Sequence, residues 1–178
     1  MKSIRDNKMS ILHIVKFGSP ILNKTSEKIE NIDESILDLA QNMVETMYTA
    51  PGIGLAAPQV NKSVRLITAD LSIGEKKEDL IILINPEIIN AEGTSTLEEG
   101  CLSVPGIHEK VTRSFQVAVK GFNLKGKERI IEAEDLLARV LLHEIDHLEG
   151  KLFIEHLSPL KRNLIKKQLK KQIEQGGI

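Results

Sequence analysis

Residues 134–148 constrain the fold most, because this segment must lie at the centre of the molecule. Read as a helix, it has leucine, isoleucine and valine around most of its circumference, which is unlike a surface helix. His143 and His147 are four residues apart, so on a helix their rings lie one above the other. Buried ring nitrogens need partners, since an unpaired buried polar group is costly. A divalent metal ion would satisfy both rings at once.

Glu144 completes the pattern H-E-x-x-H, in which two histidines bind a metal and the glutamate moves protons of a nearby water. Such a site usually takes a third protein ligand. The candidates in this chain are Cys101, Glu98, Glu99, His108, His156 and His13. A thiolate is a strong ligand for zinc or ferrous iron, which favours Cys101. We expect His108 and His156 to lie in surface segments away from the metal.

The composition indicates a globular chain with one core. It has 178 residues, 41% hydrophobic and 28% charged, with a formal net charge of -1. We therefore expect one catalytic domain over residues 1–178, with residues 1–9 as a flexible extension. The charge balance argues against specific DNA binding, and no run of 18 apolar residues predicts a membrane helix. The one cysteine cannot form an intramolecular disulfide, and the start of the chain lacks the features of a signal peptide.

Periodicity and turn residues predict a fold of the α+β class. We expect helices at 33–49, capped by Asp33, and at 134–148 and 159–174. Strands are expected at 64–69, 80–84, 116–122 and 128–133, with 88–89 extending the pairing. Residues 11–30, 52–60 and 93–107 are rich in turn-forming residues and are expected to be irregular. The predicted architecture is a set of antiparallel sheets packed around the central metal-binding helix, with N-terminal and C-terminal helices.

Three segments together resemble the three motifs of the peptide deformylases. They are GIGLAAPQ at 52–59, EGCLS at 99–103 and HEIDH at 143–147, and the resemblance extends from about residue 10 to about residue 165. It implies that Cys101, His143 and His147 bind the metal and that Glu144 is the general base and acid. It also implies that Gln59 and the backbone N–H of Leu102 hold the oxygen that becomes negative. The metal implied is Fe²⁺ in the cell, with Zn²⁺, Ni²⁺ or Co²⁺ able to replace it.

The activity implied is removal of the formyl group from the N-terminal formyl-methionine of newly made chains, with release of formate. A metal lowers the pKa of a bound water, Glu144 can take and return its proton, and oriented N–H groups stabilise the oxyanion. A methionine side chain requires an apolar pocket. Helix geometry assigns Leu136 and Val140 to this pocket, and position beside the other motifs assigns Ile53 and Leu97. Finally, glycine permits close approach of an extended peptide, at positions Gly54 and Gly100.

The partners implied are N-formylmethionyl peptides of nascent chains and the ribosome. The lysine-rich last helix could contribute to binding of the ribosome. The short segment between the first two motifs fits the mainly bacterial branch of the family (type I), and hence a bacterial cytoplasm. Arg139 is expected to pair with Asp135 at i,i+4 and to make the pocket rim more polar. Two other readings remain open: a zinc peptidase, and a non-catalytic relative that binds peptide N-termini.

Overall fold

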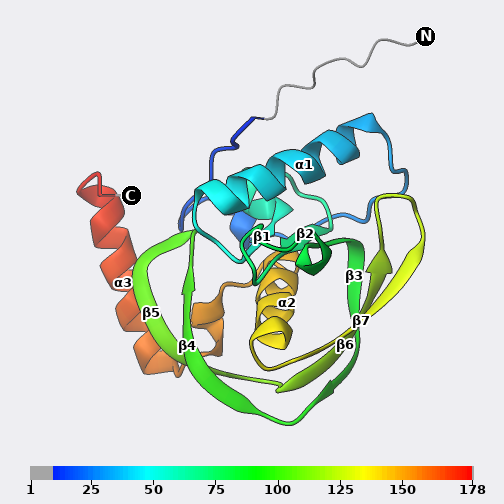
Figure 1. The fold of residues 1–178 in the computed structure, drawn as a ribbon. Helices are drawn as coiled ribbons and strands as arrows, with labels where there is room; N and C mark the ends of the chain where they lie inside the picture. The colour runs from blue at the N-terminus through cyan, green and yellow to red at the C-terminus, as the bar shows by residue number, and fades with distance from the viewer. Residues whose placement is uncertain (1–9, 178) are drawn as a thin grey trace.

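The computed structural model describes residues 10–177, and the predicted extension at residues 1–9 lies outside this range (Figure 1). Three α-helices are present: α1 (Glu34–Thr49), α2 (Asp135–Leu148) and α3 (Pro159–Glu174). Four short 3₁₀ helices are η1 (Pro20–Asn23), η2 (Ala57–Val60), η3 (Lys77–Asp79) and η4 (Phe153–His156). The strands are β1 (Gly54–Ala56), β2 (Leu66–Ala69), β3 (Ile81–Glu92), β4 (Ser95–Cys101), β5 (Val104–Arg113), β6 (Gln116–Phe122) and β7 (Glu128–Glu134). The α+β prediction is confirmed.

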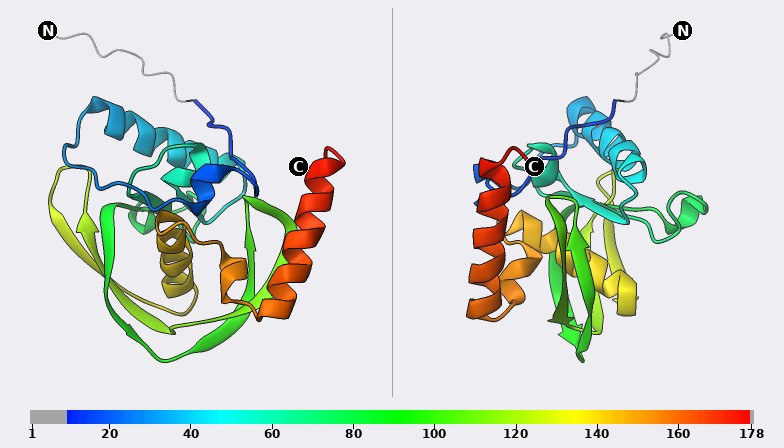
Figure 2. Two further views of the ribbon diagram at one scale, coloured as in Figure 1. Left: turned by 180° about the vertical axis from the view of Figure 1, so that it is seen from behind. Right: turned by 90° about the vertical axis from the view of Figure 1, so that its left-hand side faces the viewer.

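The strands form two antiparallel sheets. Five strands pair in the order β1-β2-β3-β6-β7, and β4 pairs with β5 as a separate two-stranded sheet. Figure 1 shows α2 at the centre of the molecule, with the strands curving around it and α1 across one end. The two views of Figure 2 show α3 on the outside, alongside the two-stranded sheet. The central helix is therefore enclosed by both sheets.

Three apolar clusters hold these elements together. Ala138, Leu141 and Leu148 of α2 pack on the five-stranded sheet, and Met43 and Met47 of α1 pack near β1 and β2. The third cluster joins the two-stranded sheet to η4 and α3 and contains Val104, Val111, Phe153, Ile165 and Leu169. Among residues 10–177, no helix combines the length and apolar composition that crossing a membrane requires.

The local signals of the helices work as predicted. The Asp33 carboxylate accepts a hydrogen bond from the Ile36 N–H at 3.2 Å and caps α1. Gly150, just after the end of α2, has a φ of 69°. Glycine adopts this left-handed conformation without strain, and it prevents the helix from continuing. All three helices therefore lie within a residue or two of the predicted bounds.

Two segments that were predicted to be irregular instead contain strands, because their glycine, serine and proline residues resemble turn signals. Residues 52–60 are not irregular: β1 pairs with β2, and η2 follows it. Residues 93–107 hold β4 and the start of β5. The predicted extension of the pairing past Pro86 is confirmed, because Ile88 pairs with Val119 and β3 continues to Glu92. A shift of register between Ile84 and Glu87 accommodates Pro86, which lacks an N–H. The strand predicted at 64–69 is shorter: β2 begins at Leu66, and Val64 forms an isolated bridge with Glu27.

Candidate metal centre and active site

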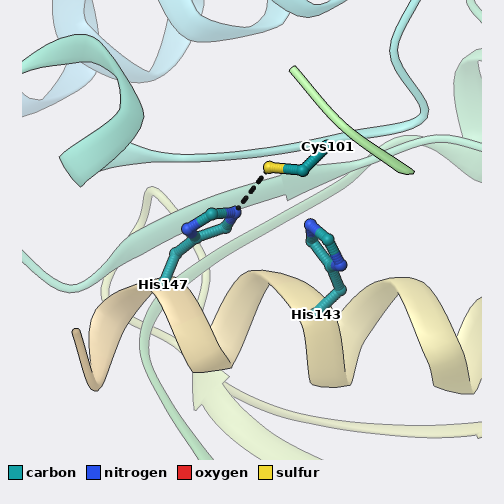
Figure 3. Close-up of side chains that lie close together, drawn as sticks. All are labelled: Cys101, His143 and His147. Atoms are coloured by element: carbon teal, nitrogen blue, oxygen red, sulfur yellow. Dashed lines mark hydrogen bonds between the residues drawn. The ribbon is translucent and has the colours of Figure 1, made fainter. Parts of the chain in front are cut away.

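Three side chains that can bind a metal converge between α2 and the end of β4. His143 and His147 extend from successive turns of α2, and Cys101 reaches them from the last residue of β4 (Figure 3). The Cys101 Sγ lies 3.3 Å from His147 Nε2. One ligand atom from each of the three residues lies within 4.8 Å of the others. This group is the one predicted from the sequence.

The chemistry of this donor set fits a divalent ion such as zinc or ferrous iron. Burial opposes ionisation of the Cys101 thiol, but the imidazoles of His147 and His143 outweigh it and hold the pKa of the thiol well below its usual range. The Nδ1 of His143 lies 3.1 Å from a carboxylate oxygen of Glu99. The ionised Glu99 carboxylate can only accept a hydrogen bond, so the Nδ1–H of His143 donates to it and the lone pair of the ring is on Nε2, on the side of the metal group.

Glu99 is the centre of a buried ionic network that the sequence did not predict. Arg113 donates to both oxygens of Glu99, at 2.6 and 3.0 Å, and also donates to Asp146 at 2.7 Å. Burial would raise the pKa of the Glu99 carboxyl, but hydrogen bonds from His143 and Arg113 outweigh it and lower that pKa to about 2. Glu99 thus stays ionised and keeps its hold on the His143 ring.

Arg139 belongs to the same network, and its predicted ion pair with Asp135 was wrong. Its guanidinium donates to Glu99 at 2.6 Å and to the Val111 carbonyl at 2.8 Å, whereas no ion pair with Asp135 is found among residues 10–177. Arg139 is 3% exposed and lines the cavity, so it adds a polar group to the cavity wall. The ion pair with Glu99 prevails because two charges attract more strongly in a buried position than at the surface.

Glu144 is buried beside the metal group. Its side chain is held next to Gly54 of β1, where an added Cβ would collide with the Glu144 carboxylate and meet Val140 at 2.9 Å. The Glu144 Oε2 has no hydrogen-bond partner within the described part of the chain, and burial raises the pKa of this carboxyl to about 7. A carboxyl group with such a pKa and a free oxygen can both accept and donate a proton near neutrality.

The Gln59 side chain is held in one orientation. Its Oε1 accepts the Ala56 N–H at 2.9 Å, so its NH₂ group must point the other way. That group lies 3.6 Å from Cys101 Sγ and 3.3 Å from Ser103 Oγ. The amide hydrogens of Gln59 are therefore directed at the metal group.

Leu102 and Ser103 form the two-residue turn between β4 and β5, since Cys101 pairs with Val104. In such a turn the backbone N–H groups of the two central residues lie outside the strand ladder. The Leu102 N–H therefore directly follows Cys101 in the chain and lies outside the pairing that holds the sheet.

A cavity of about 450 Å³ opens at the metal group. Five of the six predicted pocket residues line it: Ile53, Gly54, Gly100, Leu136 and Val140. Leu97 is not among the lining residues, and its side chain is 41% exposed on β4. The cavity also has Pro51 and Ile107 in its wall, which the sequence did not indicate.

The remaining histidines behave as expected toward the metal, although one lies closer to the site than predicted. His108 and His156 are exposed and are not part of the metal-binding group. His156 bonds the Asp146 carboxylate at 2.7 Å. The ring of His108 packs on Gly100, where an added Cβ would meet it at 2.8 Å, so His108 borders the cavity from the surface.

Comparison with known proteins decides the family. The family model described as "Polypeptide deformylase" matches residues 11–163, which include all three motifs. The chain belongs to the peptide deformylase family. It is therefore an enzyme, a deformylase with the α+β fold of that family.

The relatives of this deformylase match it over nearly their whole length. The peptide deformylase of Thermodesulfovibrio yellowstonii is 52% identical over 162 residues, covering 91% of this chain and 98% of the relative. That of Syntrophobacter fumaroxidans is 48% identical over 168 residues, covering 94% and 99%. Among solved structures, the peptide deformylase of Legionella pneumophila superposes with a TM-score of 0.87 at 42% identity, covering 94% of this chain and 98% of the other. The structure of the Ehrlichia chaffeensis enzyme in complex with actinonin superposes with a TM-score of 0.84 at 38% identity, covering 92% and 98%.

Proposed function

We propose that this chain removes the formyl group from N-formylmethionyl peptides of nascent chains and releases formate. The observation that carries the proposal is the placement of the buried Glu144 beside the group formed by Cys101, His143 and His147, at the wall of a largely apolar cavity. Family membership supports the same reaction.

In this proposal Cys101, His143 and His147 hold one divalent ion, Fe²⁺ in the cell, with Zn²⁺, Ni²⁺ or Co²⁺ as replacements in purified samples. An ion bound there would lower the pKa of a water molecule and draw electron density from the formyl oxygen. Glu99 fixes the ring of His143 for this task, and the ionised thiol of Cys101 supplies the softer ligand.

Glu144 is the proton carrier of the proposed reaction. Its carboxylate takes a proton from the attacking water and later gives one to the leaving amine, which is the N-terminus of the peptide. The charge that develops on the formyl oxygen is stabilised by the Gln59 side-chain amide and the Leu102 N–H, both beside Cys101. Glu144 thus serves the proton transfers, and the two N–H donors serve the formyl oxygen.

The proposed substrate lies with its methionine side chain in the cavity, against Ile53, Leu136 and Val140. Gly54 and Gly100 let the peptide backbone come close. The strand β1 is at the edge of the five-stranded sheet and β4 belongs to a sheet of two strands, so each has an unpaired edge. We place the peptide along these edges, with Leu97 beside its later residues rather than in the methionine pocket.

We further propose that the enzyme works in a bacterial cytoplasm, near the ribosome, where formylated chains emerge. The exposed lysines of α3, among them Lys167, Lys170 and Lys171, could approach the phosphates of ribosomal RNA. Cosedimentation with ribosomes at rising salt tests this idea. Reversal of the three charges should abolish cosedimentation, and binding that ignores both salt and these charges would contradict it.

The decisive test of the activity is formate release from formyl-Met-Ala-Ser by the enzyme prepared without oxygen and loaded with Fe²⁺. The matched control is Glu144→Gln, which removes the proton carrier and keeps the size of the side chain. We expect the parent to release formate and the variant to lose about a thousandfold in kcat at equal metal content. A fully loaded parent that releases no formate would overturn the proposal.

The identity of the metal can be tested with the same assay. A ferrous ion held by a thiolate is sensitive to oxidation. The activity of the Fe²⁺ form should therefore decay in air and persist without oxygen, whereas the Ni²⁺ form should be stable in both. Equal lifetimes of the Fe²⁺ form under the two conditions would contradict this assignment.

A further inference from the structure

Three consecutive residues near the start of the described chain contact both segments that carry the proposed oxyanion donors. The Val15 N–H donates to the Gln59 carbonyl at 2.8 Å, and the Phe17 N–H donates to the Ser103 carbonyl at 2.7 Å. Between them, the Lys16 ammonium donates to the Leu102 carbonyl at 2.8 Å. Residues 15–17 thus bridge the Gln59 segment and the Leu102 turn.

The two bridged segments belong to different parts of the fold. Gln59 lies on η2, after β1 of the five-stranded sheet, and Leu102 lies at the tip of the two-stranded sheet. No strand pairing joins the two sheets in residues 10–177. The direct bond from Gln59 Nε2 to Ser103 Oγ is long, at 3.3 Å. The bridge therefore adds to the contacts that set the spacing of the two donors, beside those of Gln59 with Ser103 and Cys101.

Lys16 contributes the one side-chain bond among the three contacts of the bridge. A hydrogen bond from an ammonium group to a carbonyl is charge-assisted and stronger than a neutral one. Lys16 is half-buried, which reduces competition from water. The Leu102 backbone is held on its N-terminal side by the pairing of Cys101 and on its C-terminal side by Lys16. The Leu102 carbonyl belongs to the peptide unit that follows the Leu102 N–H, so Lys16 restrains this N–H through the backbone dihedral angles of Leu102.

We propose that Lys16 is a positioning residue of the deformylation reaction: its bond to the Leu102 carbonyl holds the Leu102 N–H at the spacing from the Gln59 amide that the negative formyl oxygen requires. The proposal rests on the proposed function, because it concerns the same oxygen. A donor displaced by a fraction of an ångström stabilises the transition state less while the ground state is still bound. Loss of the Lys16 bond should therefore reduce kcat and leave KM unchanged.

The test compares Lys16→Met, which keeps the aliphatic chain and removes the donor, with Lys16→Arg, which restores a charged donor. The control is Lys24→Met, at an exposed lysine of the same segment. For each protein we would measure kcat and KM for formyl-Met-Ala-Ser, the metal content and the midpoint of thermal unfolding. The parent assay comes first, and formate release by the parent shows that the proposed function holds.

For Lys16→Met we expect a fall in kcat of about tenfold, with KM, metal content and unfolding midpoint close to those of the parent. Lys16→Arg should recover most of kcat, and Lys24→Met should match the parent. A Lys16→Met enzyme with the kcat of an active parent would overturn the inference and leave the proposed function intact. A joint fall of kcat and unfolding midpoint that Lys16→Arg does not reverse would also overturn it, because Lys16 would then be a structural tether.

Discussion

The two sides of α2 are held in different ways. On one side Ala138, Leu141 and Leu148 are completely buried against the five-stranded sheet. On the other side Arg139 and His143 meet the two-stranded sheet through hydrogen bonds and ion pairs to Glu99. Burial of apolar surface is strong and has no direction, whereas hydrogen bonds fix the orientation of the groups that they join.

This difference assigns a separate task to each side. The apolar side supplies stability and sets the position of the helix. The ionic side contributes little net stability, since the cost of burying charges offsets much of their attraction. It does orient the His143 ring and attach the two-stranded sheet, which as an isolated pair of strands would be marginally stable. The site is thus held by directional bonds, whereas the scaffold behind it is held by apolar packing.

The largest expected effect comes from Arg113→Met on the ionic side. The change leaves the buried Glu99 and Asp146 short of a cation, and removing one partner of such a pair destabilises a protein by about 3–5 kcal/mol. Denaturant unfolding measures the loss. The control Arg162→Met removes a half-exposed pair with Glu155 and should cost less than about 1 kcal/mol. If both variants lose less than about 1 kcal/mol of unfolding free energy, the buried carboxylates do not depend on Arg113 for stability.

A slightly smaller effect is expected from Leu141→Ala on the apolar side. The residue is fully buried, so the lost contacts and the new cavity should lower the free energy of unfolding by about 3 kcal/mol. The kcat and KM of the folded fraction should not change. Leu160→Ala, at a position 71% exposed, should stay within about 0.5 kcal/mol of the parent. A marked change of KM in Leu141→Ala would mean that the two sides are not separable.

Gly54→Ala should have the smallest effect of the three, and should appear in activity alone. The added Cβ meets Glu144 and Val140, so the carboxylate must move away from the position it occupies. We expect kcat to fall about thirtyfold, which equals about 2 kcal/mol, with the unfolding free energy nearly unchanged. A variant with the parental kcat would mean that the placement of Glu144 is not restrictive.

Local interactions could be predicted from the sequence, whereas interactions between residues far apart in the chain could not. The helices follow from periodicity and from caps such as Asp33, which act within four residues. The strands β1 and β4 were missed because glycine, serine and proline residues in and beside them indicate turns, although β4 pairs with β5 through a turn of two residues. Cys101, His143 and His147 were predicted from motif resemblance, and the structure brings them together. The bonds of Arg139 to Glu99 and of Lys16 to Leu102 join residues 40 and 86 positions apart, for which the sequence carries no pattern.

The central claim is that the ionic side of α2 and the end of β4 form a metal site on which the activity depends. The measurement that tests it most directly is the metal content of dialysed protein, compared between the parent, Cys101→Ala and Leu141→Ala. We expect about one divalent ion per chain in the parent and in Leu141→Ala, and loss of both the ion and formate release in Cys101→Ala. If Cys101→Ala keeps its full metal content and releases formate at the parental rate, Cys101 is not a metal ligand on which the activity depends.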